Sequence, residues 1–273
     1  MQRLAIDPEQ LNADGAIALT PAQGRYLYRV LRLKGGDRFV ALLTVPRADQ
    51  GQWIAELEGA DRAIAHLISP APITRSPLPP IVLLAAPPKG NAFDEVVRQA
   101  VELGAGWIVP VLSDRGLVQP SDNKLDRWRR IALEATEQCE RPDLPAIAPP
   151  VPSDRVGDCL ENLALGDRPW CRWLCVARGG PDHLLTVALA AAKAAHQDET
   201  DAESPVENLP AIAIAIGPEG GWSDREKTRF QNNFGFAPVH LGDRILRAAT
   251  APLVALSLVA AAWESTPAQT SDP

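Results

Sequence analysis

Two glycine-containing segments near the C-terminal end of this sequence are the ones best suited to hold a ligand. The first, residues 216–221 (IGPEGG), follows residues 211–216, a continuous apolar run typical of a buried parallel strand. Glycines at the carboxyl end of a strand let a ligand approach the backbone closely, and ligands bind at this end of open α/β sheets. Gly-Pro and Gly-Gly also form ordinary turns, so the spacing alone leaves a purely structural role open.

The second segment, residues 241–250 (LGDRILRAAT), follows a short apolar stretch at 238–241 and ends at Thr250, the expected N-cap of the last helix. If the two segments follow neighbouring strands, they face one pocket. Arg244 and Arg247 could then hold a phosphate or an anionic base. The alternative is that both arginines form ion pairs on the surface.

The elements that must position these segments are alternating strands and helices. Ser223 and Glu226, three residues apart, form a capping box that opens a short helix between the two segments. The other elements are predicted from apolar runs and from apolar residues at helical spacing. Strands are expected at residues 81–86, 107–112, 172–177 and 211–216, and helices at 93–101, 125–139, 184–196 and 250–263. This alternation predicts an α/β domain with a mostly parallel sheet.

A smaller β-rich domain is expected ahead of the α/β domain. The proline-rich stretch at residues 70–80 marks the boundary, which places the domains at residues 1–72 and 73–273. Two domains also fit the length of 273 residues. The first domain has short strands bounded by glycine and proline, as in a small β-barrel or sandwich, at residues 16–19, 38–43 and 52–57.

Two loops and the last helix complete the predicted α/β domain. Prolines at residues 142–152 predict a long loop, and the acidic, polar stretch at 197–209 predicts a mobile one. The last helix is apolar nearly all round. We therefore expect it to be buried on both sides, including against a partner subunit.

The net charge of −7 argues mildly against a nucleic-acid partner, but the charges are unevenly distributed. Acidic residues concentrate at 198–207, whereas a basic group lies near the N-terminus. Local charge decides where a phosphate backbone can bind, although such a group can also be a solvated face. The basic group is Arg25, Arg29, Arg32, Lys34 and Arg38, with Asp37 as its acidic neighbour.

Several other classes of protein are disfavoured. The sequence contains no GxxxxGK[ST] phosphate-binding loop, and its four cysteines form no CxxC pair, so we expect reduced, mostly buried thiols and no metal site. The N-terminus has no apolar signal segment, and the longest apolar stretch, residues 251–263, is too short to span a bilayer. A cytoplasmic protein is therefore expected.

Five segments, in the same order, carry a family resemblance. Residues 216–226 (IGPEGGWSDRE) and 241–251 (LGDRILRAATA) resemble the C-terminal signatures of the RsmE-type 16S rRNA uridine-N3 methyltransferases, a branch of the SPOUT methyltransferases. The other three segments are residues 28–33 (YRVLRL), 87–115 (PPKGNAFDEVVRQAVELGAGWIVPVLSDR) and 134–141 (EATEQCER). The resemblance covers most of the chain and fades only in an acidic insertion at about 183–210.

The resemblance implies a PUA-like β-barrel ahead of a SPOUT domain, whose C-terminal segment forms a trefoil knot. It also implies a homodimer without metal that methylates N3 of a uridine in small-subunit rRNA, free or in the assembled subunit, with S-adenosylmethionine held in the knot. The cofactor residues would be Gly217, Pro218, Gly220, Gly221, Leu241, Gly242, Ile245 and Leu246.

Catalytic and RNA-binding roles can be assigned to charged residues as hypotheses. Arg247 would stabilise the developing uracil anion, with Glu219 either orienting it or removing the N3 proton. The target base must be unpaired or splayed out of a helix. The residues expected to bind RNA phosphates are Arg25, Arg29 and Arg32, with Lys89 and Arg141 near the cofactor site.

The sequence departs from the family pattern in its second signature. Ala248 and Ala249 stand where the family usually has Thr-Glu, so any role of that acid cannot be carried over. Two alternatives stay open: a SPOUT enzyme that methylates another RNA position, such as a ribose 2′-hydroxyl, and a catalytically silent RNA-binding factor in ribosome assembly.

Overall fold

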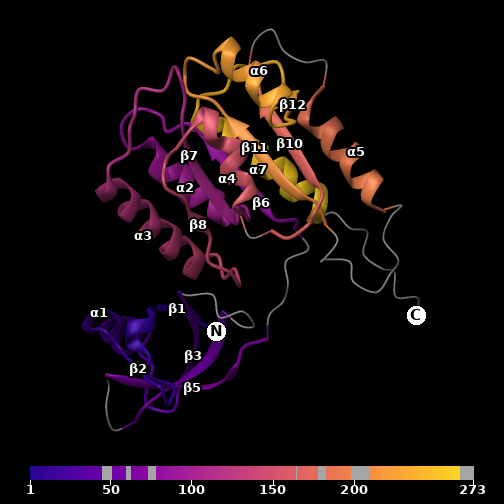
Figure 1. Ribbon diagram of the computed structural model, residues 1–273. Coiled ribbons are helices and arrows are strands. Elements are labelled where there is room, and N and C mark those ends of the chain that lie inside the picture. The colour runs from indigo at the N-terminus through magenta and orange to yellow at the C-terminus, as the bar shows by residue number, and fades with distance from the viewer. Residues whose placement is uncertain are drawn as a thin grey trace. The chain divides into compact units, whose positions relative to one another are not determined.

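The computed structural model describes residues 1–44, 51–59, 63–72, 78–163, 165–177, 183–197 and 209–264 (Figure 1). The chain divides into two compact units. The N-terminal unit comprises Met1–Arg75 with Leu133–Leu144, and the C-terminal unit comprises Ser76–Ala132 with Pro145–Pro273. The predicted boundary after residue 72 adjoins residues 73–77, which lie outside the described residues, as do residues 198–208 of the acidic insertion.

The N-terminal unit is built on a five-stranded sheet of order β1-β3-β4-β5-β2. Strands β1 and β3 are parallel and the other neighbours antiparallel. The expected strands are confirmed, but β1 and β5 were not expected. The first is only four residues long, and the second carries a histidine and a serine that interrupt its apolar pattern. The strands are β1 (Arg3–Ile6), β2 (Ala16–Ala18), β3 (Arg38–Leu43), β4 (Gln52–Leu57) and β5 (Ile64–Pro70).

Short helical turns close one side of this sheet. Thr20 and Gln23 form a capping box at the start of α1, which runs directly into the π-helical turn η2. Leu27 of that turn is fully buried in an apolar core with Phe39 and Ile17. The turns are η1 (Pro8–Gln10), α1 (Pro21–Arg25) and η2 (Tyr26–Val30).

The C-terminal unit is built on a parallel sheet of order β12-β10-β11-β6-β7-β8, with the short β9 also paired to β7. Strands β6, β7 and β11, three of the expected apolar runs, are buried on both faces. The region at residues 142–152, which was predicted as one long loop, contains two short strands, β8 and β9. That prediction was wrong. The strands are β6 (Ile81–Ala85), β7 (Trp107–Leu112), β8 (Ala146–Ile147), β9 (Val151–Pro152), β10 (Trp170–Cys175), β11 (Ala211–Ile216) and β12 (Ala237–Val239).

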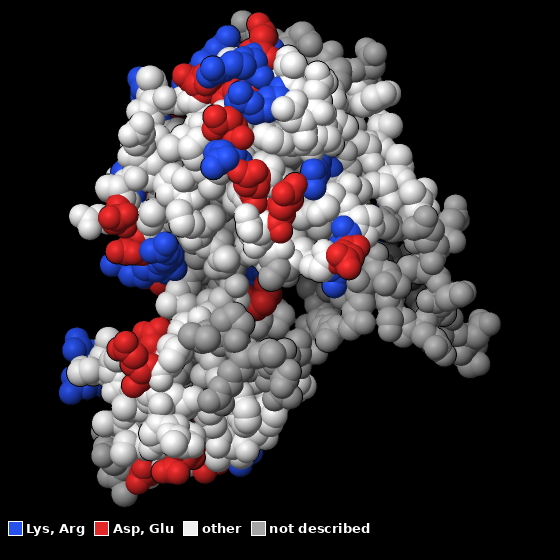
Figure 2. Space-filling view, in the orientation of Figure 1, with Lys and Arg blue, Asp and Glu red and all other residues white. Residues whose placement is uncertain are grey.

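Helices cover both faces of this sheet (Figure 1). On one face α7 packs against α2 and α5, and α3 joins α2 through the rings of Trp128 and Phe93, whose centroids are 4.5 Å apart. On the other face α4 and α6 close a cluster around Trp222 and Phe230. Acidic and basic side chains mix on the outer surface of α6 (Figure 2). The helices are α2 (Ala92–Glu102), α3 (Asp122–Gln138), η3 (Ser153–Arg155), α4 (Val156–Glu161), α5 (Leu185–Gln197), α6 (Asp224–Asn232) and α7 (Thr250–Glu264).

The last helix, α7, is buried on one side only within this chain. Its buried side includes Leu256, Val259 and Trp263, whereas Leu253 and Leu258 are partly exposed. Of the two sides of α7 that were expected to be buried, only one is therefore buried within a single chain. The four cysteines are free as expected, although they are half-buried instead of mostly buried. Among the described residues, no helix is long and apolar enough to cross a membrane.

Candidate functional site

A cavity of about 540 Å³ lies at the carboxyl ends of four strands of the C-terminal unit. Both glycine-containing segments line it, as the sequence predicted. Their strands, β11 and β12, are not neighbours, because β10 lies between them and contributes its own carboxyl end. The lining is Pro88, Lys89, Ala92, Cys175, Val176, Ala177, Ile216, Gly217, Pro218, Glu219, Gly221, Trp222, Leu241, Gly242, Arg244, Ile245, Leu246, Arg247, Ala248, Ala249 and Ala251.

The segment after β11 turns sharply beside this cavity. The N–H of Gly221 donates to the carbonyl of Pro218 at 2.8 Å, and Gly221 has a φ of +67°, which strongly favours glycine. A side chain at Gly217 would place its Cβ 3.2 Å from the indole ring of Trp222. Glycine at 217 therefore keeps the backbone tight against a buried tryptophan and leaves its other side facing the cavity.

A hydrogen-bond network around one buried carboxylate, that of Glu226, holds this segment in place. The Arg115 Nη1 donates to the carbonyl of Gly220 at 2.9 Å. The Glu226 carboxylate is fully buried and accepts from the backbone N–H groups of Asp114 and Ser223, both at 2.8 Å. The loop after β7 is thereby tied to the start of α6, and the turn at residues 217–221, which we call the glycine turn, lies between them.

The carboxylate of Asp114 completes the network. It accepts from Arg225 Nη2 at 2.7 Å and from Ser223 Oγ at 2.6 Å, and these bonds lower the pKa of Asp114 below its ordinary value. The predicted capping box of Ser223 and Glu226 is confirmed. What the sequence did not reveal is the second bond of Glu226, to a residue more than one hundred positions earlier.

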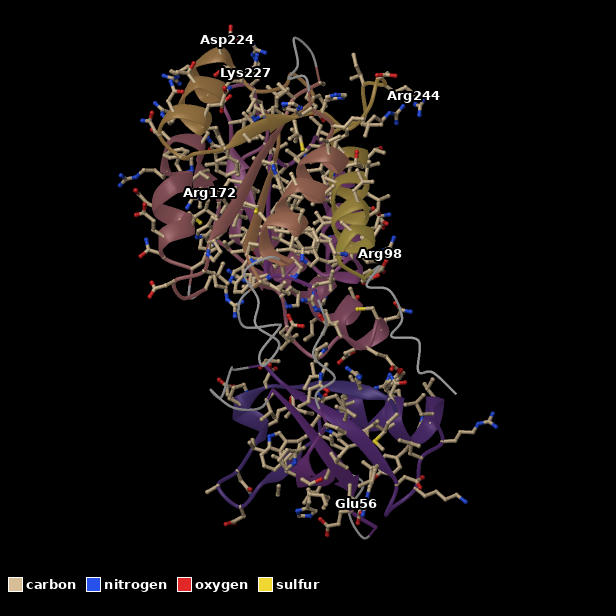
Figure 3. All side chains as sticks on the ribbon, turned by 90° about the vertical axis from the view of Figure 1, so that its right-hand side faces the viewer. Glu56, Arg98, Arg172, Asp224, Lys227 and Arg244 are labelled. Atoms are coloured by element: carbon tan, nitrogen blue, oxygen red, sulfur yellow. The ribbon has the colours of Figure 1, made fainter. Side chains whose placement is uncertain are left out.

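The segment after β12 presents its arginines to open space. Gly242 has a φ of +109°, and Ile245 is 58% exposed. Arg244 and Arg247 are both exposed, and Arg244 projects outward near the first turn of α7 (Figure 3). Neither arginine forms an ion pair with any carboxylate of the described residues. Within that part of the chain, the surface ion pairs considered as an alternative are not formed.

The cavity is charged unevenly. Lys89, Arg244 and Arg247 line it, and Glu219 is the one carboxylate among the described lining residues. The Oε1 of Glu219 accepts from the backbone N–H of Lys89 at 3.3 Å, which brings the loops after β6 and β11 together. The excess of positive charge suits a substrate group that becomes anionic during the reaction.

Cys175, at the end of β10, also lines the cavity. Burial raises the pKa of its thiol to about 12, so the sulfur stays protonated at neutral pH. A protonated thiol is a weak nucleophile. This disfavours chemistry in which Cys175 would form a covalent intermediate. Among the described residues, no three His, Cys, Asp or Glu side chains gather as a metal site would require.

The remaining predicted RNA-binding residues lie in the N-terminal unit. Arg25 and Arg29 are exposed there, and Arg32 has a φ of +59°, unusual for a residue other than glycine. Arg141 belongs to the same unit, but its side chain is only 10% exposed and pairs with Asp143 at 2.6 Å. It therefore presents little free surface to a phosphate.

Comparison with known proteins gives a consistent result. Residues 74–260 match the model of a family described as RNA methyltransferase domain. The chain is 40% identical over 265 residues to Ribosomal RNA small subunit methyltransferase E of Synechocystis, which covers 96% of this chain and 78% of that protein. The enzyme of the same name from Bacillus subtilis is 27% identical, with 95% of this chain and 96% of that protein covered.

Two solved structures share the fold along nearly the whole chain. Ribosomal RNA small subunit methyltransferase E from Neisseria gonorrhoeae, bound to S-adenosyl methionine, has a TM-score of 0.70 and 26% identity, and covers 97% of this chain and 100% of its own. A putative methyltransferase from Legionella pneumophila in complex with the same cofactor has a TM-score of 0.67 and 25% identity, with 95% and 97% covered. The protein belongs to the ribosomal RNA small subunit methyltransferase E family of RNA methyltransferases.

Proposed function

We propose that this protein transfers a methyl group from S-adenosylmethionine to N3 of a uridine in 16S rRNA of the small ribosomal subunit. The names of its relatives support the class of substrate. The proposed reaction at N3 rests on the position of Arg247. This residue is an exposed cation on the wall of the cavity, with no carboxylate partner among the described residues. A cation that is not neutralised can stabilise a base that loses its N3 proton.

The cavity fits the proposed cofactor. Its volume of about 540 Å³ lies in the range typical of small-molecule sites. A Cβ at Gly221 or Gly242 would meet nothing within 4 Å, so both glycines border open space. Backbone groups of Gly217, Gly221 and Gly242 would hold the polar parts, while Leu241, Ile245 and Leu246 would cover the apolar ones. We assign Pro218 and Gly220 to the same site, although Gly220 faces Arg115 and does not line the cavity.

Different residues of the cavity have different roles in the proposed reaction. When bound, S-adenosylmethionine supplies an electrophilic methyl group on a sulfonium. Glu219 accepts the N3 proton of the uracil, since Ala248 and Ala249 provide no acid and no other carboxylate of the described residues lines the cavity. Arg247 stabilises the negative charge that the base acquires, which makes N3 the nucleophile toward the methyl group that the bound cofactor would supply. Positioning of the base contributes up to ~7–11 kcal/mol in well-oriented cases.

Three further proposals concern the architecture, and a fourth concerns the location of the enzyme in the cell. The five-stranded sheet at residues 1–72 is a PUA-like barrel that binds RNA, and residues 73–273 form the SPOUT domain with its trefoil knot around the cavity. The partly exposed apolar side of α7, with Leu253 and Leu258, is the interface of a homodimer. Since the substrate is ribosomal RNA, the enzyme acts in the cytoplasm.

In the N-terminal unit we assign phosphate contacts to Arg25, Arg29 and Arg32. Arg25 ends α1, Arg29 lies in the π-helical turn η2, and Arg32 lies two residues after that turn. Strained backbone conformations of residues other than glycine cluster at functional sites, and so do single π-helical turns. The left-handed backbone of Arg32 beside η2 therefore supports a binding role for this surface. Arg141, held by Asp143, would position the surrounding chain in this proposal.

Arg32→Gly separates the charge of this residue from its backbone strain. Glycine accepts a φ of +59°, so the free energy of unfolding should stay the same or rise by up to about 1 kcal/mol. RNA binding should weaken nonetheless, because one cation is lost. Urea unfolding and filter binding to small-subunit rRNA measure the two effects. Arg155→Gln, which removes a surface ion pair with Asp158 outside this basic group, serves as the control and should leave RNA binding unchanged. Unchanged RNA binding in Arg32→Gly would remove Arg32 from the RNA site.

The reaction itself is tested with labelled S-adenosylmethionine and small ribosomal subunits from cells that lack the modification. After digestion of the RNA, labelled 3-methyluridine identified by mass spectrometry is the expected product. Label on a ribose would instead show a SPOUT enzyme with another target. Cofactor binding without any transfer, beside an active control enzyme, would show an RNA-binding assembly factor.

A further inference from the structure

A row of basic side chains begins at the edge of the cavity and continues on α3. Lys89 lines the cavity, and the adjacent Gly90 has its carbonyl bonded to the Nζ of Lys124 at 3.3 Å. Arg127 follows one turn further along α3 and is half exposed. We call Lys89, Lys124 and Arg127 the basic rim. Figure 2 shows basic side chains on the surface of this helix.

The geometry of α3 places Lys124 and Arg127 on one face. Residues three apart on a helix have their Cβ atoms about 5–6 Å from one another. Arg129 is turned by about 140° from Lys124 around the helix axis, since each residue advances by roughly 100°. It pairs with Asp126 at 2.9 Å. On this helix Lys124 and Arg127 thus continue the edge of the cavity, whereas Arg129 points elsewhere.

The charges of the basic rim are only partly compensated. The Lys124 ammonium bonds to a neutral carbonyl, which leaves its charge intact and further N–H donors available. Arg127 Nε binds Asp94 Oδ2 at 2.8 Å, and Asp94 is held in turn by the indole N–H of Trp128 at 2.9 Å. This largely buried carboxylate orients the guanidinium, yet 51% of the Arg127 side chain stays exposed.

We infer that the basic rim binds phosphates of the substrate RNA, so that the strand beside the target nucleotide runs from the cavity along the first half of α3. This inference rests on the proposed function. A base that enters the cavity must be splayed from its neighbours, which brings the flanking phosphates to the edge of the cavity. On the side of the loop after β6, Lys89 and Lys124 are the groups that meet them.

Lys124→Met in the full-length protein tests this inference, with Arg129→Met as the matched control on the same helix. The affinity for a fluorescent oligouridylate is measured against KCl concentration. Each phosphate contact to a single strand contributes about 0.7 to the slope of log affinity against log salt. Lys124→Met should reduce the slope by about that amount, Lys124→Arg should restore it, and Arg129→Met should leave it unchanged.

Two more measurements separate RNA binding from support of the cavity. With unmodified small ribosomal subunits, Lys124→Met should raise KM severalfold while kcat stays within about twofold, as expected when a sequence-independent contact is lost. Its Kd for S-adenosylmethionine, from calorimetry, should match that of the wild type. An unchanged salt slope and KM would overturn the inference, as would a weakened cofactor Kd with an unchanged slope. If the wild type methylated no RNA while Lys124→Met still lost slope, the proposed function would fail and the basic rim would stand.

Discussion

Arg247→Ala is expected to lower kcat by about two to three orders of magnitude, which is the effect of removing one preorganised group that stabilises a developing negative charge. The side chain is exposed on the wall of the cavity, so its loss leaves no buried group without a partner. The carbonyl of Arg247 accepts from the N–H groups of Thr250 and Ala251, and alanine retains these backbone bonds at the start of α7. The variant should therefore fold normally and bind S-adenosylmethionine with a Kd close to that of the wild type.

Single-turnover methylation and calorimetry with the cofactor measure the two quantities. Arg244→Ala is the matched control, because it removes a cation from the same segment that projects outward (Figure 3). It should affect the KM for RNA more than kcat. Arg247→Lys should recover part of the rate, since it restores the charge but not the planar guanidinium. An equal loss of cofactor binding and turnover in Arg247→Ala would mean that Arg247 contacts the cofactor instead of the base.

The central strands could be predicted from the sequence because they are buried on both faces. Strands β6, β7 and β11 are uninterrupted apolar runs, and their predicted bounds agree with the structure to within one residue. Strand β10 begins two residues earlier than predicted. Its first residues, Trp170 and Cys171, are only half-buried, and Arg172 lies within the strand, so hydrophobicity alone marks its start poorly.

The cavity could be predicted in its parts but not in its assembly. Glycines after two apolar strands indicated both loops, yet the insertion of β10 between those strands depends on pairing across the sheet. The same holds for Arg115, Asp114 and Glu226. Their side chains or backbone groups meet only because β7 and the segment after β11 end at the same edge of the sheet. Local sequence gives Glu226 a capping role, and only the fold gives it a second donor.

This second donor makes Glu226 the position where substitution should reduce stability most among the residues that support the glycine turn. Glu226→Ala leaves the N–H groups of Asp114 and Ser223 without their acceptor. A buried donor that loses its acceptor costs about 1–3 kcal/mol, so the loss of both bonds should lower the free energy of unfolding by about 2–6 kcal/mol. Glu226→Gln keeps the volume and one carbonyl oxygen and should cost less. Urea unfolding followed by tryptophan fluorescence measures both.

Asp224→Ala provides the control on the same helical turn. Asp224 is exposed and pairs only with Lys227 among the described residues, so its loss should change stability by no more than about 0.5 kcal/mol. In Glu226→Ala the loop after β7 loses its buried link to the start of α6 and keeps only the exposed bonds of Asp114, so the glycine turn is less firmly supported. The affinity for S-adenosylmethionine should then fall even where the protein is still folded. Equal stability of Glu226→Ala and Asp224→Ala would show that the two buried N–H groups find other acceptors, and that the bonds of Arg115 and Asp114 are enough to hold the turn.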